Sequence, residues 1–227
     1  MSVWTRITEA LSVLAKGDGL AAVFDRLRTP PERSVAFTIA VIALGAKMAK
    51  ADGRVTRDEV TAFRKVFTIQ PGEEANAARV FNLARQDVAG FEAYARKIAG
   101  MFGAGDEVLI DLMEGLFCIA TADGEYHDAE DAFLRRVAEI FGLGERCFRS
   151  LVGRHVPDAP PDPYAVLGVD HGAALDEVRA AWRAAVRETH PDRMAARGLP
   201  EEAVKLAEAR LIAVNRAWEE ISHARAA

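Results

Sequence analysis

Apolar positions in the last third of the chain recur every three or four residues. One run lies between Leu175 and Thr189, and a second begins after Pro200 and ends near Ser222. The apolar positions are Val178, Ala181, Trp182 and Ala185 in the first run, and Val204, Ala207, Leu211, Val214, Trp218 and Ile221 in the second. This period places each set on one face of a helix, so the two runs predict an antiparallel helical hairpin with a coiled-coil-like seam.

A shorter helix is predicted just before the hairpin. Pro163 suits the first turn of a helix, Asp162 precedes it as a cap, and Gly168 ends it. Tyr164 and Leu167 of this helix would cover one end of the hairpin. A domain of about 60 residues is just large enough to be held together by such a core.

Residues in the first two-thirds of the chain repeat at a constant offset of 71 positions. Ala51-Asp52-Gly53 recurs as Ala122-Asp123-Gly124, and Glu59 recurs as Glu130. The same offset pairs Met48 with Ile119, Phe63 with Leu134, Val66 with Val137 and Ile69 with Ile140. Each copy is therefore predicted to be a helix, a short Asp-Gly loop and a second helix.

The loops of the repeat carry helix-capping signals. Each Gly is expected to take a left-handed conformation that ends the preceding helix. Thr56 and Glu59 have the spacing of a capping box, but the second copy has His127 in place of Thr56, so Asp128 is expected to cap there. Two further helices are predicted between the copies, over Glu73–Ala89 and Phe91–Met101.

The clearest boundary in the chain is a stretch with four prolines between His155 and Pro163. Such a segment cannot continue a helix and tends to be extended. Because Ala is abundant and strand formers are sparse, we predict an all-α fold. The predicted parts are an N-terminal amphipathic segment (1–30), a helical domain with the repeat (31–154), a proline-rich linker (155–161) and the helical-hairpin domain (162–227).

Composition narrows the class of protein. The chain is 50% hydrophobic and 28% charged, as soluble globular proteins are. Its net charge of −5 argues against nucleic acid as a partner. Cys118 and Cys147 have no metal-type spacing, so we expect buried free thiols in a reducing compartment and neither a bound metal nor a cofactor.

Nothing in the hydropathy pattern predicts membrane insertion. The longest apolar run, Val35–Ala46, is shorter than the roughly 20 residues that cross a bilayer and is interpreted as a buried helix. Residues 1–24 alternate apolar and polar positions and do not have the pattern of a signal peptide. We therefore expect a cytoplasmic protein.

The hairpin loop and the helix before it carry the candidate binding residues. The loop opens with His190-Pro191-Asp192, where Pro191 ends the preceding helix and stiffens the backbone that presents Asp192. Arg179, Arg183 and Arg187 are spaced by four and share one helix face. Asp176 can offset the first of them. A row of this kind is usually a solvated face, but next to a rigid acidic tip it favours a surface that binds a partner.

At these residues the chain resembles the J-domain of the DnaJ family. The resemblance rests on three stretches: Asp-Pro-Tyr-Ala-Val-Leu-Gly-Val from Asp162, Glu-Val-Arg-Ala-Ala-Trp-Arg from Glu177, and His-Pro-Asp-Arg from His190. It covers roughly residues 162–222. One departure is Thr189, where an aromatic residue is common; we expect it to alter local packing only.

The order of the two domains is similar to that of the DjlA group, whose N-terminal part is related to the TerB (tellurite resistance) domain. The Arg-Gly-Leu-Pro stretch from Arg197 is similar to that group as well. The group's namesake carries an N-terminal membrane helix, for which residues 1–24 are too polar, so membrane anchoring is not carried over.

The resemblance implies a co-chaperone that binds a DnaK-type chaperone and stimulates its ATPase. His190, Pro191, Asp192 and Arg193 would contact the partner near its interdomain linker, and Arg179, Arg183 and Arg187 would orient the helix on an acidic surface. The chain would not be an enzyme itself, and no phosphate-binding loop is present in the sequence. The N-terminal domain would recruit a client or localise the protein.

Three alternatives stay open at the level of sequence. His190 and Asp192 could act as an acid–base pair, although side chains two residues apart across a proline need not meet. Asp52, Glu59, Asp123 and Glu130 could bind a cation, although one Asp and one Glu per copy are too few for calcium and helix capping explains them as well. The hairpin could also be a degenerate J-domain that serves only as an interaction module. No signature decides the oligomeric state.

Overall fold

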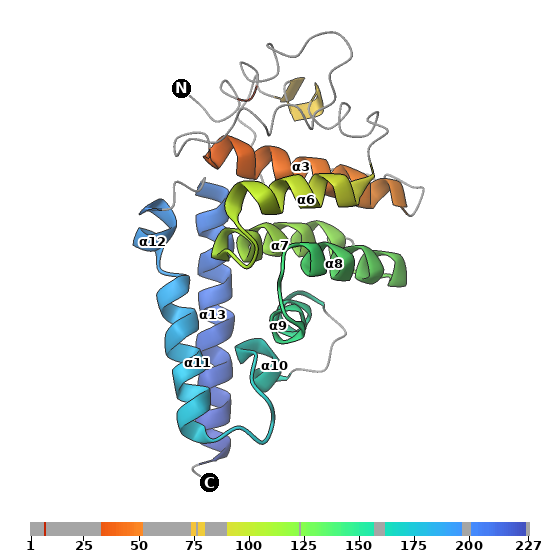
Figure 1. Ribbon diagram of the computed structural model, residues 1–227. Coiled ribbons are helices and arrows are strands. Elements are labelled where there is room, and N and C mark those ends of the chain that lie inside the picture. The colour runs from red at the N-terminus through yellow and green to blue at the C-terminus, as the bar shows by residue number, and fades with distance from the viewer. Residues whose placement is uncertain are drawn as a thin grey trace.

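The computed structural model describes residues 7, 33–51, 74–75, 77–79, 90–122, 124–156, 162–196 and 201–225, and within these the fold is all helical, as predicted. The N-terminal part contains α3 (Arg33–Ala51), α6 (Phe91–Phe102), α7 (Glu107–Ala120), α8 (Asp128–Ile140) and α9 (Glu145–His155). The C-terminal part contains α10 (Pro163–Leu167), α11 (Leu175–Glu188), α12 (Pro191–Ala196) and α13 (Glu201–Ala224). Figure 1 shows α3, α6, α7 and α8 stacked across the long axis of the hairpin that α11 and α13 form.

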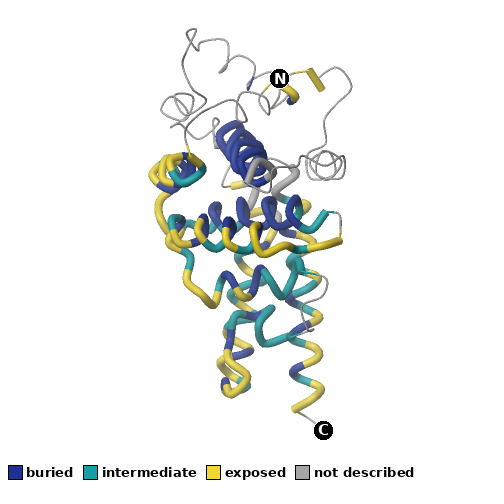
Figure 2. The backbone as a smooth tube through the Cα atoms, turned by 90° about the vertical axis from the view of Figure 1, so that its right-hand side faces the viewer, coloured by how far each residue is buried: buried dark blue, intermediate teal, exposed yellow. Residues whose placement is uncertain are grey.

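Helix α3 of the N-terminal part is buried over most of its length. Its residues 35–48 are all buried, as the dark blue helix in Figure 2 shows, and this confirms that the apolar run Val35–Ala46 is a core helix. A helix that is apolar on every side must be covered on every side. The helix approaches α7 closely at glycines: a Cβ on Gly45 would lie 3.1 Å from the side chain of Ile119, and one on Gly115 would lie 3.4 Å from that of Val41.

The second copy of the repeat is a helix, a loop and a helix, as predicted, and consists of α7, residues 121–127 and α8. Gly124 has a positive φ of 90°, but the preceding helix already ends at Ala120, before the Asp-Gly pair. The expected cap at Asp128 is wrong: His127 is the N-cap, and its N–H donates to the side chain of Glu130 over 3.0 Å. Glu130 therefore supplies the acidic half of a capping box.

Of the first copy, the structure describes α3 but not the part that follows. Asp52, Gly53, Thr56 and Glu59 lie outside the described residues, as does Asp123 of the second copy. The predicted helix over Phe91–Met101 is α6, whereas only positions 74–75 and 77–79 of the one predicted over Glu73–Ala89 are described, all of them helical.

Candidate functional site

The C-terminal hairpin is built around one apolar cluster. Trp182 of α11 stacks on Trp218 of α13 with ring centroids 5.2 Å apart, and its Nε1–H donates to Asn215 over 2.8 Å. The fully buried members of the cluster are Leu167, Val169, Ala173, Val178, Val214, Ala217 and Ile221. The predicted seam is thus confirmed for the second half of α13. Its first half differs, because Val204 and Ala207 pack against the core of the N-terminal part instead.

The helix before the hairpin forms as its capping signals predict. The side chain of Asp162 accepts from the N–H of Tyr164 over 3.0 Å, and Gly168 ends α10 in the left-handed region with φ of 67°. Arg225, which directly follows α13, donates to the Ala173 carbonyl over 2.8 Å and to the hydroxyl of Tyr164 over 3.1 Å. Arg225 therefore ties the end of α13 to α10 and to the segment before α11.

The tip of the hairpin forms a short helix, α12, where the sequence predicted a loop. Pro191 is the first residue of α12, a position where its missing N–H costs nothing. The N–H of Asp192 donates to Nδ1 of His190 over 3.2 Å, which leaves the Asp192 side chain 92% exposed. Thr189, which departs from the aromatic residue of the family, is buried and its hydroxyl donates to the Ala185 carbonyl over 2.8 Å. The tip therefore presents an exposed carboxylate.

The three predicted arginines of α11 are all exposed. Arg179 pairs with Asp176 over 3.4 Å, as expected, and its guanidinium lies 5.7 Å from the centre of the Trp218 ring. Among the described contacts, Arg183 and Arg187 form no ion pair. Arg193 on the tip instead lies 3.9 Å from the carboxylate of Glu107 in the first turn of α7.

His190 and Asp192 approach each other, with Nδ1 and Oδ2 3.7 Å apart. Their side chains are 57% and 92% exposed. Catalytic acid–base pairs work on a substrate held in a cleft, whereas this pair lies on an open tip. The arrangement favours contact with a protein surface.

Of the four acidic residues considered for a cation, Glu130 alone is described. Its side chain accepts from the N–H of His127, which is a capping role. The part of the chain that the structure describes contains no group of three or more His, Cys, Asp or Glu side chains placed to hold a metal ion.

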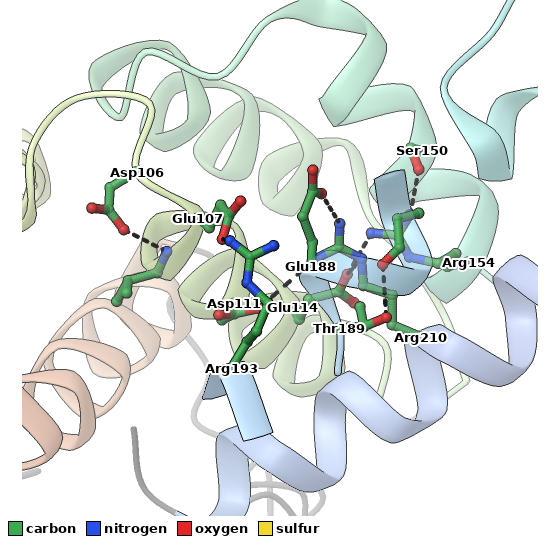
Figure 3. A network of polar contacts seen from close by, with 12 residues as sticks. Asp106, Glu107, Asp111, Glu114, Ser150, Arg154, Glu188, Thr189, Arg193 and Arg210 are labelled. Carbon is green, nitrogen blue, oxygen red and sulfur yellow. Dashed lines mark hydrogen bonds and ion pairs between the residues drawn. The ribbon is translucent and has the colours of Figure 1, made fainter. Parts of the chain in front are cut away.

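A buried network of charges lies where the hairpin meets the N-terminal part (Figure 3). At its centre is Glu114 of α7, only 3% exposed, which is bonded by Arg154 and His155 of α9. Arg210 of α13 lies 3.8 Å from Glu114, 3.8 Å from Asp111 of α7 and 3.7 Å from Glu188, the last residue of α11. The network therefore joins α7 and α9 to both helices of the hairpin.

The charges in this network shift one another's pKa values. Burial acts to raise the pKa of Glu114, but Arg154, His155 and Arg210 outweigh it and hold that pKa well below its usual range. Burial likewise acts to lower the pKa of His155, yet the carboxylate of Glu114 raises it to about 9. For Asp111 burial dominates over the attraction of Arg210, and its pKa is raised to about 7.

Comparison with known proteins agrees with this architecture. Residues 38–152 match the family model described as tellurite resistance protein TerB, and residues 162–226 match that of the DnaJ domain. Proteins called co-chaperone protein DjlA are similar over most of the chain. That of Photobacterium profundum is 27% identical over 91% of this chain and 84% of its own length, and that of Coxiella burnetii is 27% identical over 78% and 73%. No solved structure matches the chain.

This chain belongs to the DjlA-like J-domain proteins, with a TerB domain followed by a J-domain.

Membership of the DjlA-like group corrects the expected localisation. A cytoplasmic protein was expected from the polarity of residues 1–24, but the chain is related over most of its length to DjlA proteins, and the namesake of that group carries an N-terminal membrane helix. Apart from Ile7, residues 1–24 lie outside the described part of the chain. None of the helices in the described part is long and apolar enough to cross a membrane.

The buried network of this DjlA-like chain escaped the sequence analysis. Asp111 and Glu114 interrupt an otherwise apolar helix at a spacing of three, and Arg210 interrupts an apolar stripe between Ala207 and Val214. Charges on a core-facing stripe are rarely buried unless paired. The sequence could therefore have indicated that Asp111, Glu114 and Arg210 form buried ion pairs, but it could not have indicated which of them contact each other.

The two cysteines should differ in reactivity. Cys118 Sγ lies 3.8 Å from His155 Nδ1. Burial raises the pKa of the Cys147 thiol, which lowers the fraction of the reactive thiolate at that residue. Iodoacetamide at pH 7.5 should therefore alkylate Cys118 severalfold faster than Cys147, as read by mass spectrometry. Equal rates in the unaltered chain would contradict this expectation.

Stability should fall as the pH rises from about 7 to 9. The folded-state pKa of His155 is raised from 6.5 to about 9, so its contribution is complete below 6.5 and is lost as the pH passes through 9. The slope approaches about 1.4 kcal/mol per pH unit for one proton. The contribution of Asp111 changes only between its ordinary 3.8 and about 7. Urea unfolding of His155→Gln at the same pH values should show a lower stability and a flatter slope; an equally steep slope would assign the effect to another group.

Proposed function

We propose that this DjlA-like protein is a co-chaperone that binds a DnaK-type chaperone through α11 and α12 and stimulates its ATPase. The observation that carries the proposal is the exposed carboxylate of Asp192 in the first turn of α12, directly after the helix that carries the exposed arginines. The curated relatives share the name co-chaperone protein DjlA. The ATP and its hydrolysis belong to the partner, and this chain supplies a binding surface and no catalytic group.

The proposed binding residues are His190, Pro191, Asp192 and Arg193 at the tip and Arg179, Arg183 and Arg187 on α11. An acidic partner surface would meet the arginines, which steer the encounter, while Asp192 would meet a basic group on the partner.

We propose the division into residues 31–154 and 162–227 for the two domains. The TerB domain would recruit a client or place the protein in the cell.

The test is steady-state ATP hydrolysis by the DnaK of the same organism, measured with increasing amounts of the full chain. We expect a saturable increase in the rate, and no hydrolysis without DnaK. Binding without any increase in rate would identify the hairpin as an interaction module only. Hydrolysis of ATP by this chain without DnaK would instead support the hypothesis that His190 and Asp192 act as an acid–base pair.

A further inference from the structure

The long helix of the J-domain belongs to two apolar cores. Val204 and Ala207 in its first half pack against the TerB core, and Ala207 is only 2% exposed. Val214 and Ile221 in its second half are buried in the J-domain core. Figure 1 shows α13 running past α7 at one end and along α11 for the rest of its length. The two domains therefore share a helix across their boundary.

Arg210 stands between these two halves, three residues after Ala207. Its side chain is 10% exposed and reaches Asp111 and Glu114 on the TerB side. In the other direction it reaches Glu188, which lies two residues before His190. One guanidinium thus links two buried carboxylates of α7 to the base of the tip, as Figure 3 shows.

Contacts at a second place join the same two domains. The hydroxyl of Ser150 on α9 donates to the Val166 carbonyl of α10 over 2.6 Å, and Arg154 donates to that hydroxyl. Arg146 of α9 pairs with Asp170, just after α10, over 2.9 Å. The hairpin is thus held both near its tip and beside α10, and a body held at two separate places cannot rotate freely about either.

We propose that the TerB domain holds the J-domain in one orientation, with Arg210 as the positioning residue that fixes the base of the His190-Pro191-Asp192 tip. The docking leaves Asp192 and the arginines of α11 exposed, so the orientation is one in which a partner can bind. A client on the TerB domain is then presented at a set angle to the chaperone. This last consequence, and the kinetic test below, rest on the proposed function.

The docking is tested without any chaperone. Labels attached through p-azidophenylalanine at Ala93 on α6 and Ala180 on α11, both exposed, report the distance between the domains in the full chain. We expect one narrow distance distribution in the parent chain, a measurably wider one in Arg210→Met, which keeps the contacts beside α10, and partial recovery in Arg210→Lys. The matched control is Arg216→Met, which removes an exposed arginine from the same helix and should leave the distribution narrow. An unchanged distribution in Arg210→Met overturns the proposal.

The effect on the tip is tested by the ATPase assay with the same variants. If loss of Arg210 lets the tip sample other orientations, the concentration for half-maximal stimulation rises by the inverse of the competent fraction, about three- to tenfold, while the rate at saturation stays the same. A merely structural defect would lower the saturating rate as well. An unchanged half-maximal concentration in Arg210→Met overturns the positioning role.

Glu188→Gln provides the second variant if Arg210→Met fails to fold. Glu188 is one-third exposed and removing its charge leaves both cores intact. Glu188→Gln should also raise the concentration for half-maximal stimulation. An unchanged concentration in this variant would overturn the positioning role as well. If the parent chain itself gives no stimulation, the proposed function fails, while the distance measurement still decides the docking.

Discussion

Asp192→Asn is expected to abolish stimulation of the partner ATPase at working concentrations. The side chain of Asp192 is 92% exposed in the free chain, and its burial against a basic group of the partner would create a desolvated charge pair. Removing one member of such a pair costs about 2 to 5 kcal/mol, which is at least about thirtyfold in affinity. Titration of each protein into the steady-state ATPase assay measures the loss.

The control for this variant is Glu208→Gln, the same change of charge at an exposed position on α13. It should stimulate as the unaltered chain does. The fold of Asp192→Asn should be intact, because surface substitutions usually change the free energy of unfolding by no more than about 0.5 kcal/mol. Normal stimulation by a folded Asp192→Asn variant would remove the tip from the binding surface.

Glu114→Gln is expected to lower the free energy of unfolding by about 3 to 5 kcal/mol at pH 7. The reason is that Arg154, His155 and Arg210 would lose the negative charge that compensates them in a site from which water is excluded. Because the pKa of Glu114 is lowered by folding, its contribution is present above the ordinary value of 4.5 and is lost as the pH falls. Urea unfolding at pH 7 and pH 4 measures both effects.

Glu139→Gln is the matched control for this second variant. Glu139 also pairs with an arginine, Arg136 at 2.8 Å, but both side chains are about half exposed. Such surface pairs are worth at most about 1 kcal/mol. If Glu114→Gln were no less stable than Glu139→Gln, the buried network would not contribute to the stability of the junction.

The order of the two domains could be predicted because its signals are local in sequence. Asp162 and Gly168 bound α10 as predicted, since a cap and a left-handed glycine act on the turn next to them. The second copy of the repeat also formed a helix, a loop and a helix. The tip itself was less well predicted: Pro191 starts a helix where a loop was expected, because a proline that ends one helix also suits the first position of the next.

The all-helical architecture could be derived from the amino-acid sequence, because the apolar period and the capping residues of each helix depend on neighbours a few positions away. Which of the two cores each apolar side chain enters depends on how the helices pack in three dimensions. Val204 and Val214 lie on one stripe of α13, yet the first packs on the TerB core and the second on the J-domain core. The ion pairs of Arg210 with Asp111 and Glu114 likewise depend on the packing of α13 against α7. Periodicity specifies which face of a helix is apolar, whereas the partner of that face depends on the path of the whole chain.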